Sequence, residues 1–324
     1  MNKQQVSEVV RRFHGMKVLV IGDVMLDEYI WGHVSRVSPE APVIVVDADR
    51  QSHVPGGAAN VVNNVCALSG VGVMVGVVGR DPAGEALAAA LEGEGALTSG
   101  LIAAEGRPTT RKTRIIAHSQ QVVRVDHEQR AALSAQTAAR LDETVCALAK
   151  DAGAIILSDY QKGVLAPALI ETAIRCARER CIPITGNLKP AALTGSAAVD
   201  VITMNLHEAS VAMGGVPLAA EDEIEAAGRA LRERTGSGSI LITRGERGAT
   251  LVDAAGARLV APRRVEVYDT AGAGDTVVTT LTMALAAGAD MSEAAAIASH
   301  AASEVVKKLG VATVSPDEVI ASFA

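Results

Sequence analysis

Aromatic side chains are scarce in this sequence. Its 324 residues include one tryptophan, three tyrosines and two phenylalanines, although 49% of the residues are hydrophobic. The core must therefore be built from alanine, valine, leucine and isoleucine, a composition that suits helices packed on a sheet. The length is enough for one large domain, or for one domain with a small appendage.

Other absences exclude further classes of protein. The four cysteines include no Cys-x-x-Cys pair, which favours buried free thiols in a reducing compartment over a disulfide framework. A formal net charge of −7 argues against a nucleic-acid partner. The sequence has neither a long uninterrupted apolar span nor a charged-then-apolar leader, so we expect a cytoplasmic protein without a membrane partner.

A stretch of small residues near the C-terminus lacks the two best-known nucleotide motifs. Asp269–Thr276 (DTAGAGDT) has no Gly-Lys-Ser/Thr, and it has no third glycine of the dinucleotide fingerprint. It has instead Gly272, Ala273 and Gly274, which run into Asp275 and an apolar segment of helical length. A helix start suits an anion such as a phosphate, and a carboxylate there can accept a proton from a hydroxyl. The alternative is an ordinary turn followed by a helix-start acid.

A second glycine stretch lies far upstream, at Pro55–Val65 (PGGAANVVNNV). Together the two stretches resemble the signatures of the ribokinase-like (PfkB) carbohydrate kinases, which use one for the sugar and the other for phosphoryl transfer. The resemblance implies an enzyme with ATP and Mg²⁺ as cofactors. It also implies an α/β fold: a ribokinase-like three-layer sandwich with a mainly parallel central sheet and a small β lid.

The hydrophobic pattern agrees with this fold. From Lys17–Gly22 to Ser239–Thr243, apolar strands alternate with helical runs, which indicates parallel βαβ units. Arg111–Asp126 alternates polar and apolar residues, as in a half-exposed hairpin, and with Pro42–Asp47 it predicts a separate small sheet. We expect one domain over 1–324, with a lid formed from about 33–50 and 108–127. Many family members dimerise through this lid, so the resemblance implies a homodimer.

The resemblance also implies where the sugar binds. Asp27 follows the first strand, where the family has a sugar-binding aspartate, whereas we expect Asp23 to be a solvated loop acid. Gly56 and Gly57 would let sugar hydroxyls approach the backbone, and the Asn60 amide could both donate to and accept from a diol. The alternative for these three residues is a helix entry with an incidental asparagine.

For phosphoryl transfer, the resemblance makes Asp275 the base and the N–H groups of Ala271–Gly274 an anion cradle. Asn205 and Glu208 match the family's Asn-x-x-Glu element, which helps hold the magnesium–phosphate assembly, mostly through water. Their alternative is a helix N-cap followed by a first-turn acid.

The nucleotide would lie against Thr243, Gly245 and Gly248, which resemble the family's Thr-[Arg/Leu]-Gly element. Two positions depart from the family pattern. His300 stands where an asparagine commonly lies near the adenine, and we expect it to be structural. Asn187 replaces the aspartate of an Asp-Pro-Lys element, so any charge-dependent role at that position is in doubt.

Segments spread over almost the whole chain resemble the branch of the family that phosphorylates heptose phosphates, in its stand-alone kinase form. A substrate that carries its own phosphate needs cations, and the candidates are Lys112, Arg114, Arg124 and Lys189. Each of these side chains has a solvated strand face as its alternative. Two other functions stay open: a kinase for another sugar or a nucleoside, and a non-catalytic sugar-binding regulator.

Overall fold

The computed structural model describes residues 1–118, 120–193 and 198–323. Its central sheet contains β1 (Lys17–Gly22), β4 (Val71–Gly79), β5 (Leu97–Ala104), β8 (Ala154–Ser158), β9 (Ile184–Asn187), β10 (Val201–Asn205), β11 (Ser239–Thr243), β12 (Ala249–Asp253) and β13 (Gly256–Val260). Their order is β13-β12-β11-β10-β9-β8-β1-β4-β5. The strands from β11 to β5 in this order pair in parallel, and β12 and β13 add an antiparallel edge.

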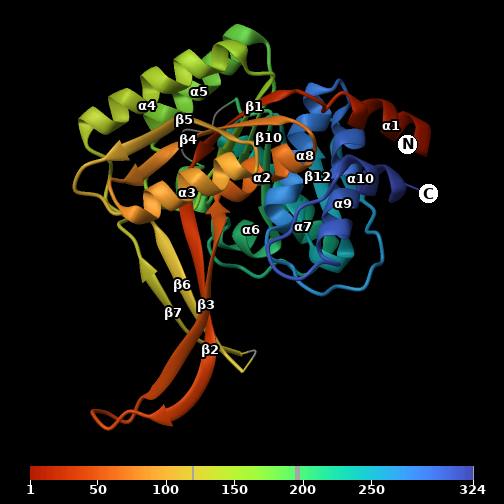
Figure 1. Cartoon of the computed structure of the whole chain (residues 1–324). Coiled ribbons are helices and arrows are strands. Elements are labelled where there is room, and N and C mark those ends of the chain that lie inside the picture. Colours follow the sequence, from red (N-terminus) through yellow and green to blue (C-terminus); the bar gives the residue numbers. More distant parts are fainter. Residues whose placement is uncertain (119, 194–197, 324) are drawn as a thin grey trace.

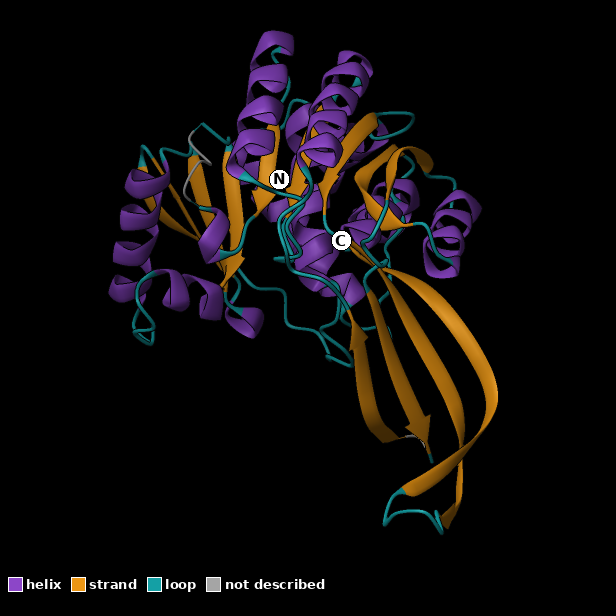
Figure 2. Ribbon diagram, turned by 90° about the vertical axis from the view of Figure 1, so that its left-hand side faces the viewer, coloured by secondary structure: helices purple, strands orange, loops and turns teal. Residues whose placement is uncertain are grey.

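Helices cover both faces of this sheet and make three layers (Figures 1 and 2). One layer contains α1 (Lys3–Arg11), α2 (Ala58–Ala67), α3 (Pro82–Gly93), α8 (Ala273–Ala286), α9 (Met291–Val305) and α10 (Pro316–Ala321). The other contains α4 (Ala135–Leu148), α5 (Pro167–Arg180), α6 (Leu206–Ala212) and α7 (Glu221–Thr235). No helix in the described ranges has the length and apolarity needed to cross a membrane.

The alternation along β1 shows why the core has two halves. Val18 and Val20 belong to the core cluster under α2, α8 and α9, whereas Leu19 and Ile21 belong to the cluster under α4 and α5. Successive strand residues point to opposite faces, so a strand that is apolar throughout must be covered on both sides. All four side chains are fully buried.

A four-stranded sheet, the lid, projects from this body (Figure 2). Its strands are β2 (Val24–Val37), β3 (Ile44–Gly57), β6 (Arg111–Ala117) and β7 (Gln120–His127), in the order β3-β2-β6-β7. The hairpin predicted at Arg111–Asp126 is present as β6 and β7, although its Ser119 lies outside the described residues.

The first lid hairpin is longer than the predicted segment 33–50. β2 begins at Val24, one residue after Asp23, so Asp27 lies in a strand and not in a loop. The sequence does not indicate this early start of β2. Asp27 and Glu28 are neighbours and both mostly buried, so the start of the strand shows no polar–apolar alternation. Strand β5 and the short helix α10 were also not predicted, and α6 was foreseen only as the helix start of the capping alternative for Asn205 and Glu208. A helix of six or seven residues is too short to show a helical period.

Two side-chain predictions are corrected. Asp23 is not solvated but 1% exposed, and its carboxylate accepts backbone hydrogen bonds at 2.9–3.0 Å from Tyr160, Lys162 and Val164. It therefore fixes the segment that follows β8. All four cysteines are free, but of the four only Cys176 is buried: Cys66 and Cys146 are half-buried, and Cys181 is exposed.

Candidate active site

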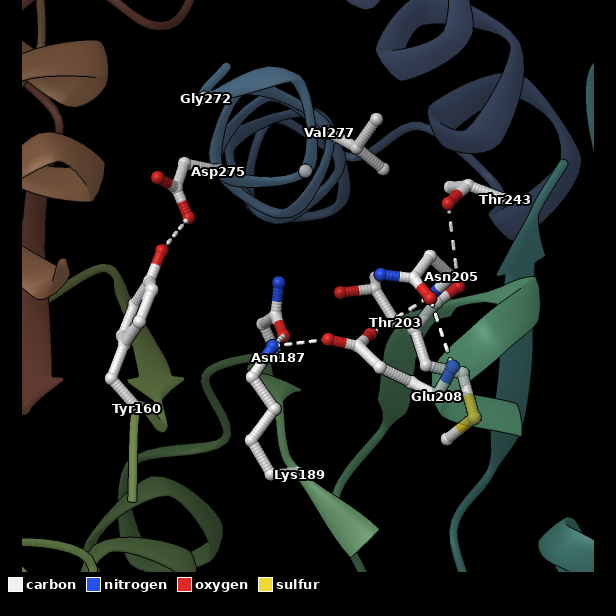
Figure 3. Close-up of a pocket in the computed structure, with 12 residues that line it drawn as sticks. Tyr160, Asn187, Lys189, Thr203, Asn205, Glu208, Thr243, Gly272, Asp275 and Val277 are labelled. Atoms are coloured by element: carbon white, nitrogen blue, oxygen red, sulfur yellow. Dashed lines mark hydrogen bonds and ion pairs between the residues drawn. The ribbon is translucent and has the colours of Figure 1, made fainter. Parts of the chain in front are cut away.

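The N-terminus of α8 forms one wall of the candidate active site (Figure 3). Its N-cap, Gly272, has φ of +79°, a left-handed conformation, and a Cβ there would lie 3.0 Å from Asn60 Nδ2, so glycine is required. Asp275 follows in the first turn of the helix and is 6% exposed.

Not all the backbone of this helix start is available to an anion. The N–H of Ala271 donates to Asp269 Oδ1 at 2.9 Å, and the N–H of Ala273 donates to Thr270 O at 3.3 Å. Within the part of the chain that the structure describes, the N–H groups of Gly272 and Gly274 have no protein partner. Of the predicted anion cradle, the N–H groups of these two glycines remain available, and the N–H of the next residue, Asp275, has no partner among the described residues either. These donors lie at the positive end of the helix dipole.

Both carboxylate oxygens of Asp275 are held by donors. Asn60 Nδ2, from α2, donates to Oδ2 at 2.7 Å, and the Tyr160 hydroxyl, from the segment after β8, donates to Oδ1 at 2.7 Å. Burial raises the pKa of Asp275, while the two hydrogen bonds and the charge of Lys189 lower it. The pKa of Tyr160 lies well above its usual value because of burial and the neighbouring Asp275, so the phenol remains a donor.

Tyr160 was not singled out from the sequence, although it lies where open α/β sheets bind ligands, just beyond the carboxyl end of a parallel strand. We expect Tyr160→Phe to raise the pKa of Asp275, because one of the bonds that favour its charged form is removed. The acidic limb of the pH–kcat/KM profile should move to higher pH, since a base must be ionised to act. An unchanged profile would show that this hydroxyl does not control the carboxylate.

The opposite wall carries a lysine and a glutamate (Figure 3). Lys189 Nζ forms an ion pair with Glu208 Oε1 and donates to Asn187 Oδ1 at 3.4 Å. Asn205 is the N-cap of α6: its side chain accepts from the Glu208 N–H at 2.9 Å, and Glu208 accepts from the Asn205 N–H at 2.9 Å. The capping alternative is therefore confirmed, yet the Glu208 carboxylate still faces the site.

These two walls enclose a cavity of about 150 Å³, lined among others by Asp275, Gly272, Gly274, Lys189 and Glu208. The cavity therefore places a potential base, an anion-binding helix start and a cation around one small space. Negative charge that develops there would meet fixed donors.

A larger cavity of about 1060 Å³ adjoins the first and shares Asn205, Thr243, Gly274 and Val277 with it. Thr243, Gly245 and Gly248 line it, and α9 supplies its far side. Its volume suits a ligand larger than a monosaccharide.

His300 does not occur among the described residues that line this cavity. Its Nδ1 lies 3.0 Å from Ser322 Oγ, and its ring stacks on Phe323 at 3.6 Å. The histidine thus joins α9 to the C-terminal segment, as expected for a structural side chain.

The predicted sugar residues meet where the lid joins the body. Arg114 Nη1, on β6, donates to Asp27 Oδ1 at 2.5 Å, and Asp27 is 7% exposed. A methyl group at Gly56 would collide with Asp27 Oδ2, and Gly57 has φ of +61°. Asn60 connects these residues to the catalytic candidate, because its amide donates a hydrogen bond to the Asp275 carboxylate.

The remaining lid cations share one acid. Asp126 is 3.5 Å from Lys112 Nζ and 2.8 Å from Arg124 Nε. Lys112 is paired with Asp27 in the strand register, and Arg114 with Tyr29. Because positions two apart in a strand share a face, Lys112 and Arg114 lie on the face that carries Asp27.

Comparison with known proteins assigns the chain to a family. The model of the pfkB family of carbohydrate kinases matches residues 16–318. The chain belongs to the pfkB family of carbohydrate kinases. This family membership confirms the predicted sugar-kinase activity.

Among curated relatives, the bifunctional protein HldE of Pelobacter propionicus is 41% identical over 325 residues, and that of Gluconacetobacter diazotrophicus is 42% identical over 312. These matches cover 100% and 96% of this pfkB chain but only 66% and 64% of the two relatives. The chain therefore spans about two thirds of their length or slightly less.

Solved structures confirm the ribokinase-like fold. Arabidopsis thaliana ribokinase, complexed with ribose and ATP, superposes with a TM-score of 0.74 at 18% identity, covering 96% of this chain and 99% of the ribokinase. Escherichia coli phosphofructokinase-2, in complex with fructose-6-phosphate, gives 0.76 at 20% identity and covers 95% and 98%. At these identities the similarity concerns the fold alone.

Proposed function

We propose that this pfkB kinase transfers the γ-phosphoryl group of ATP to the anomeric C1 hydroxyl of D-glycero-D-manno-heptose 7-phosphate. The product would be heptose 1,7-bisphosphate, for ADP-heptose and lipopolysaccharide core synthesis. The main support is the position of Asp275, between the sugar candidates at the lid root and the large cavity that would take ATP. The 41% identity to a bifunctional HldE protein supports the choice of a heptose phosphate.

In this proposal Asp275 accepts the proton of the attacking hydroxyl. Asn60 and Tyr160 fix the orientation of its carboxylate, while the free N–H groups of the helix start and the Lys189 ammonium stabilise the transferring phosphoryl group. Lys189 was a candidate for the sugar's own phosphate. Its ion pair with Glu208, in the cavity that Asp275 also lines, favours the transferring group instead.

The site also fits Mg²⁺ carried by the nucleotide. Among the described residues no group of three or more acidic, histidine or cysteine side chains could enclose a metal, but Mg²⁺ commonly keeps several waters and binds substrate phosphates. Glu208 and Asn205 would hold it through water, because their side chains line the cavity next to the anion cradle.

Glu208→Gln is expected to raise the Mg²⁺ concentration needed for half-maximal rate, because the amide keeps the shape but loses the charge. The measurement is a metal titration at saturating ATP and sugar. Glu223→Gln, an exposed first-turn acid of α7, is the matched control. Equal titration curves for Glu208→Gln and the wild type would remove Glu208 from the metal site.

The 7-phosphate of the sugar would bind the lid cations Lys112 and Arg114. Lys112→Ala and Arg114→Ala should each weaken binding of heptose 7-phosphate by about 10- to 100-fold and leave ATP affinity unchanged, because charge-assisted hydrogen bonds are lost. Partial hydration of the phosphate would reduce this loss. Affinity for heptose without the 7-phosphate separates the roles of the two residues. It should change little in Lys112→Ala, but it should change in Arg114→Ala, because Asp27 loses its ion-pair partner there.

Arg111→Ala is the control for both variants. Arg111 precedes Lys112 on the same strand, but it pairs with Glu28 at 3.8 Å on the other face of the lid. If Arg111→Ala lowers heptose 7-phosphate affinity as much as the other two variants do, the effect comes from a general loss of positive charge on the lid and not from direct binding of the 7-phosphate.

We also propose a homodimer through the lid. Val123 and Val125 of β7 are 44% and 53% exposed, and they lie on the face opposite to Lys112 and Arg114. Exposed valines on one face of a thin sheet gain free energy when a second copy covers them.

The proposed reaction is tested by incubating the protein with heptose 7-phosphate, ATP and Mg²⁺ and detecting a second sugar phosphate by phosphorus NMR. Thermal shift with the sugar, with and without an ATP analogue, separates binding from catalysis, because a ligand of the native state raises its stability. Stabilisation without turnover would indicate a sugar-binding regulator. Turnover of another sugar or a nucleoside in preference to heptose 7-phosphate would overturn the substrate.

A further inference from the structure

Two cysteines outside the active site lie side by side on neighbouring helices. Cys146 is in the last turns of α4 and Cys176 is in α5, and the two helices lie together on one face of the molecule (Figure 1). Their sulfur atoms are 3.5 Å apart. Neither residue lines the cavities described above, so the kinase chemistry does not account for the pair.

The two thiols have different surroundings. Cys146 is half-buried, and its Sγ accepts contacts at 3.5 Å from both Arg175 Nη2 and the Cys176 thiol. Both contacts point at this sulfur, and one of them comes from a guanidinium. Cys176 is only 5% exposed, and burial together with Cys146 raises its pKa to about 11. Cys146 is thus the thiol suited to attack an oxidant, and Cys176 is a protonated neighbour.

We propose that Cys146 and Cys176 form a reversible disulfide when the protein encounters hydrogen peroxide. The Cys146 thiolate attacks one peroxide oxygen and breaks the O–O bond, which leaves a sulfenic acid and, after protonation, one water. The Cys176 sulfur then attacks the sulfenic sulfur, and its proton leaves with the hydroxyl as a second water. In sum, two thiols and one peroxide give one disulfide and two waters, and the sulfurs supply both electrons.

Forming this disulfide requires little movement of the two side chains. A disulfide bond is about 2.0 Å long, so the sulfurs must approach by about 1.5 Å. Arg175 is exposed, so its side chain can turn away as the two sulfurs approach. The bond would close a chain loop that contains β8 and the segment from Asp159 to Lys162, so it would constrain the unfolded chain.

The other two cysteines provide controls within the same chain. Cys181 is exposed at the end of α5, and the sulfur contact recorded for it is to the carbonyl oxygen of Arg178 at 3.8 Å. Cys66 lies in α2, on the opposite face of the sheet, and burial raises its pKa. A protein with Cys66→Ser and Cys181→Ser therefore retains only the proposed pair.

The test treats this double variant with a small excess of hydrogen peroxide. We expect both thiols to disappear, a mass decrease of about 2 Da from the loss of two hydrogens, and a cross-linked peptide joining Cys146 to Cys176. Dithiothreitol should restore both thiols, and the oxidised form should melt at a higher temperature than the reduced form. Adding Cys176→Ala should replace the bridge with a sulfenic acid that dimedone traps on Cys146.

Arg175→Gln should slow the loss of thiols several-fold without preventing the bridge, because the guanidinium contact to the Cys146 sulfur is lost. Three results would overturn the proposal: thiols that persist in the double variant, a mass increase from added oxygen with no cross-linked peptide, or bridges found only between separate chains. Each outcome is independent of kinase activity, so a failure here leaves the proposed function untouched.

Discussion

Asp275→Asn is expected to lower kcat by about 10²–10⁴-fold while ATP and sugar still bind. The amide keeps the size of the carboxylate but cannot accept the proton of the attacking hydroxyl. A loss at the low end of this range would be natural, because a loose phosphoryl-transfer transition state needs less help from a base. The measurements are steady-state kinetics, nucleotide affinity and melting temperature.

The surroundings of Asp275 also predict a stability cost for this variant. In the wild type, Asn60 Nδ2 and the Tyr160 hydroxyl both donate to the carboxylate. An asparagine presents one N–H₂ group, which must face one of these donors unless Tyr160 turns to accept, and a lost buried bond costs about 1–3 kcal/mol. Asp290→Asn, at the N-cap of α9, is the control, since asparagine caps helices as well as aspartate does. Wild-type turnover in Asp275→Asn would refute its role as the base.

Lys189→Met is expected to lower kcat by about 10²–10³-fold, the usual effect of removing one donor that stabilises charge in the transition state. Methionine keeps most of the length of the side chain but leaves Glu208 without this ion pair, beside the proposed phosphoryl site. Because the contact would strengthen only as the phosphoryl group is transferred, KM for the sugar should change far less than kcat.

Lys150→Met is the control for this variant, because Lys150 is exposed after the end of α4. A large rise in KM for heptose 7-phosphate with kcat unchanged would return Lys189 to the sugar's own phosphate. An effect on neither constant would exclude both roles.

The parallel sheet and the Asp275 helix could be predicted from the sequence because their signals are local. Apolar runs such as Val18–Ile21 show a buried strand directly, and Gly272 and Gly274 stand next to the acid that they position. Tyr160 could not be found in this way, because its partner is 115 positions away along the chain. Asp23 shows the same limit: an acid after a strand usually meets water, and here three N–H groups from a distant segment replace it.

The lid also contains the molecule's own optical probe. Trp31 is the single tryptophan of the chain, and it lies in β2 between the buried root at Val24 and the exposed end at Val37, stacked with Tyr29 and beneath the Arg50 guanidinium. A strand of 14 residues is roughly 45 Å long, so a 5° tilt about the root would move its tip by about 4 Å. Trp31 fluorescence, excited at a wavelength that only tryptophan absorbs, would therefore report movement of the lid in solution. The rest of the protein would not emit, and no attached dye would be needed.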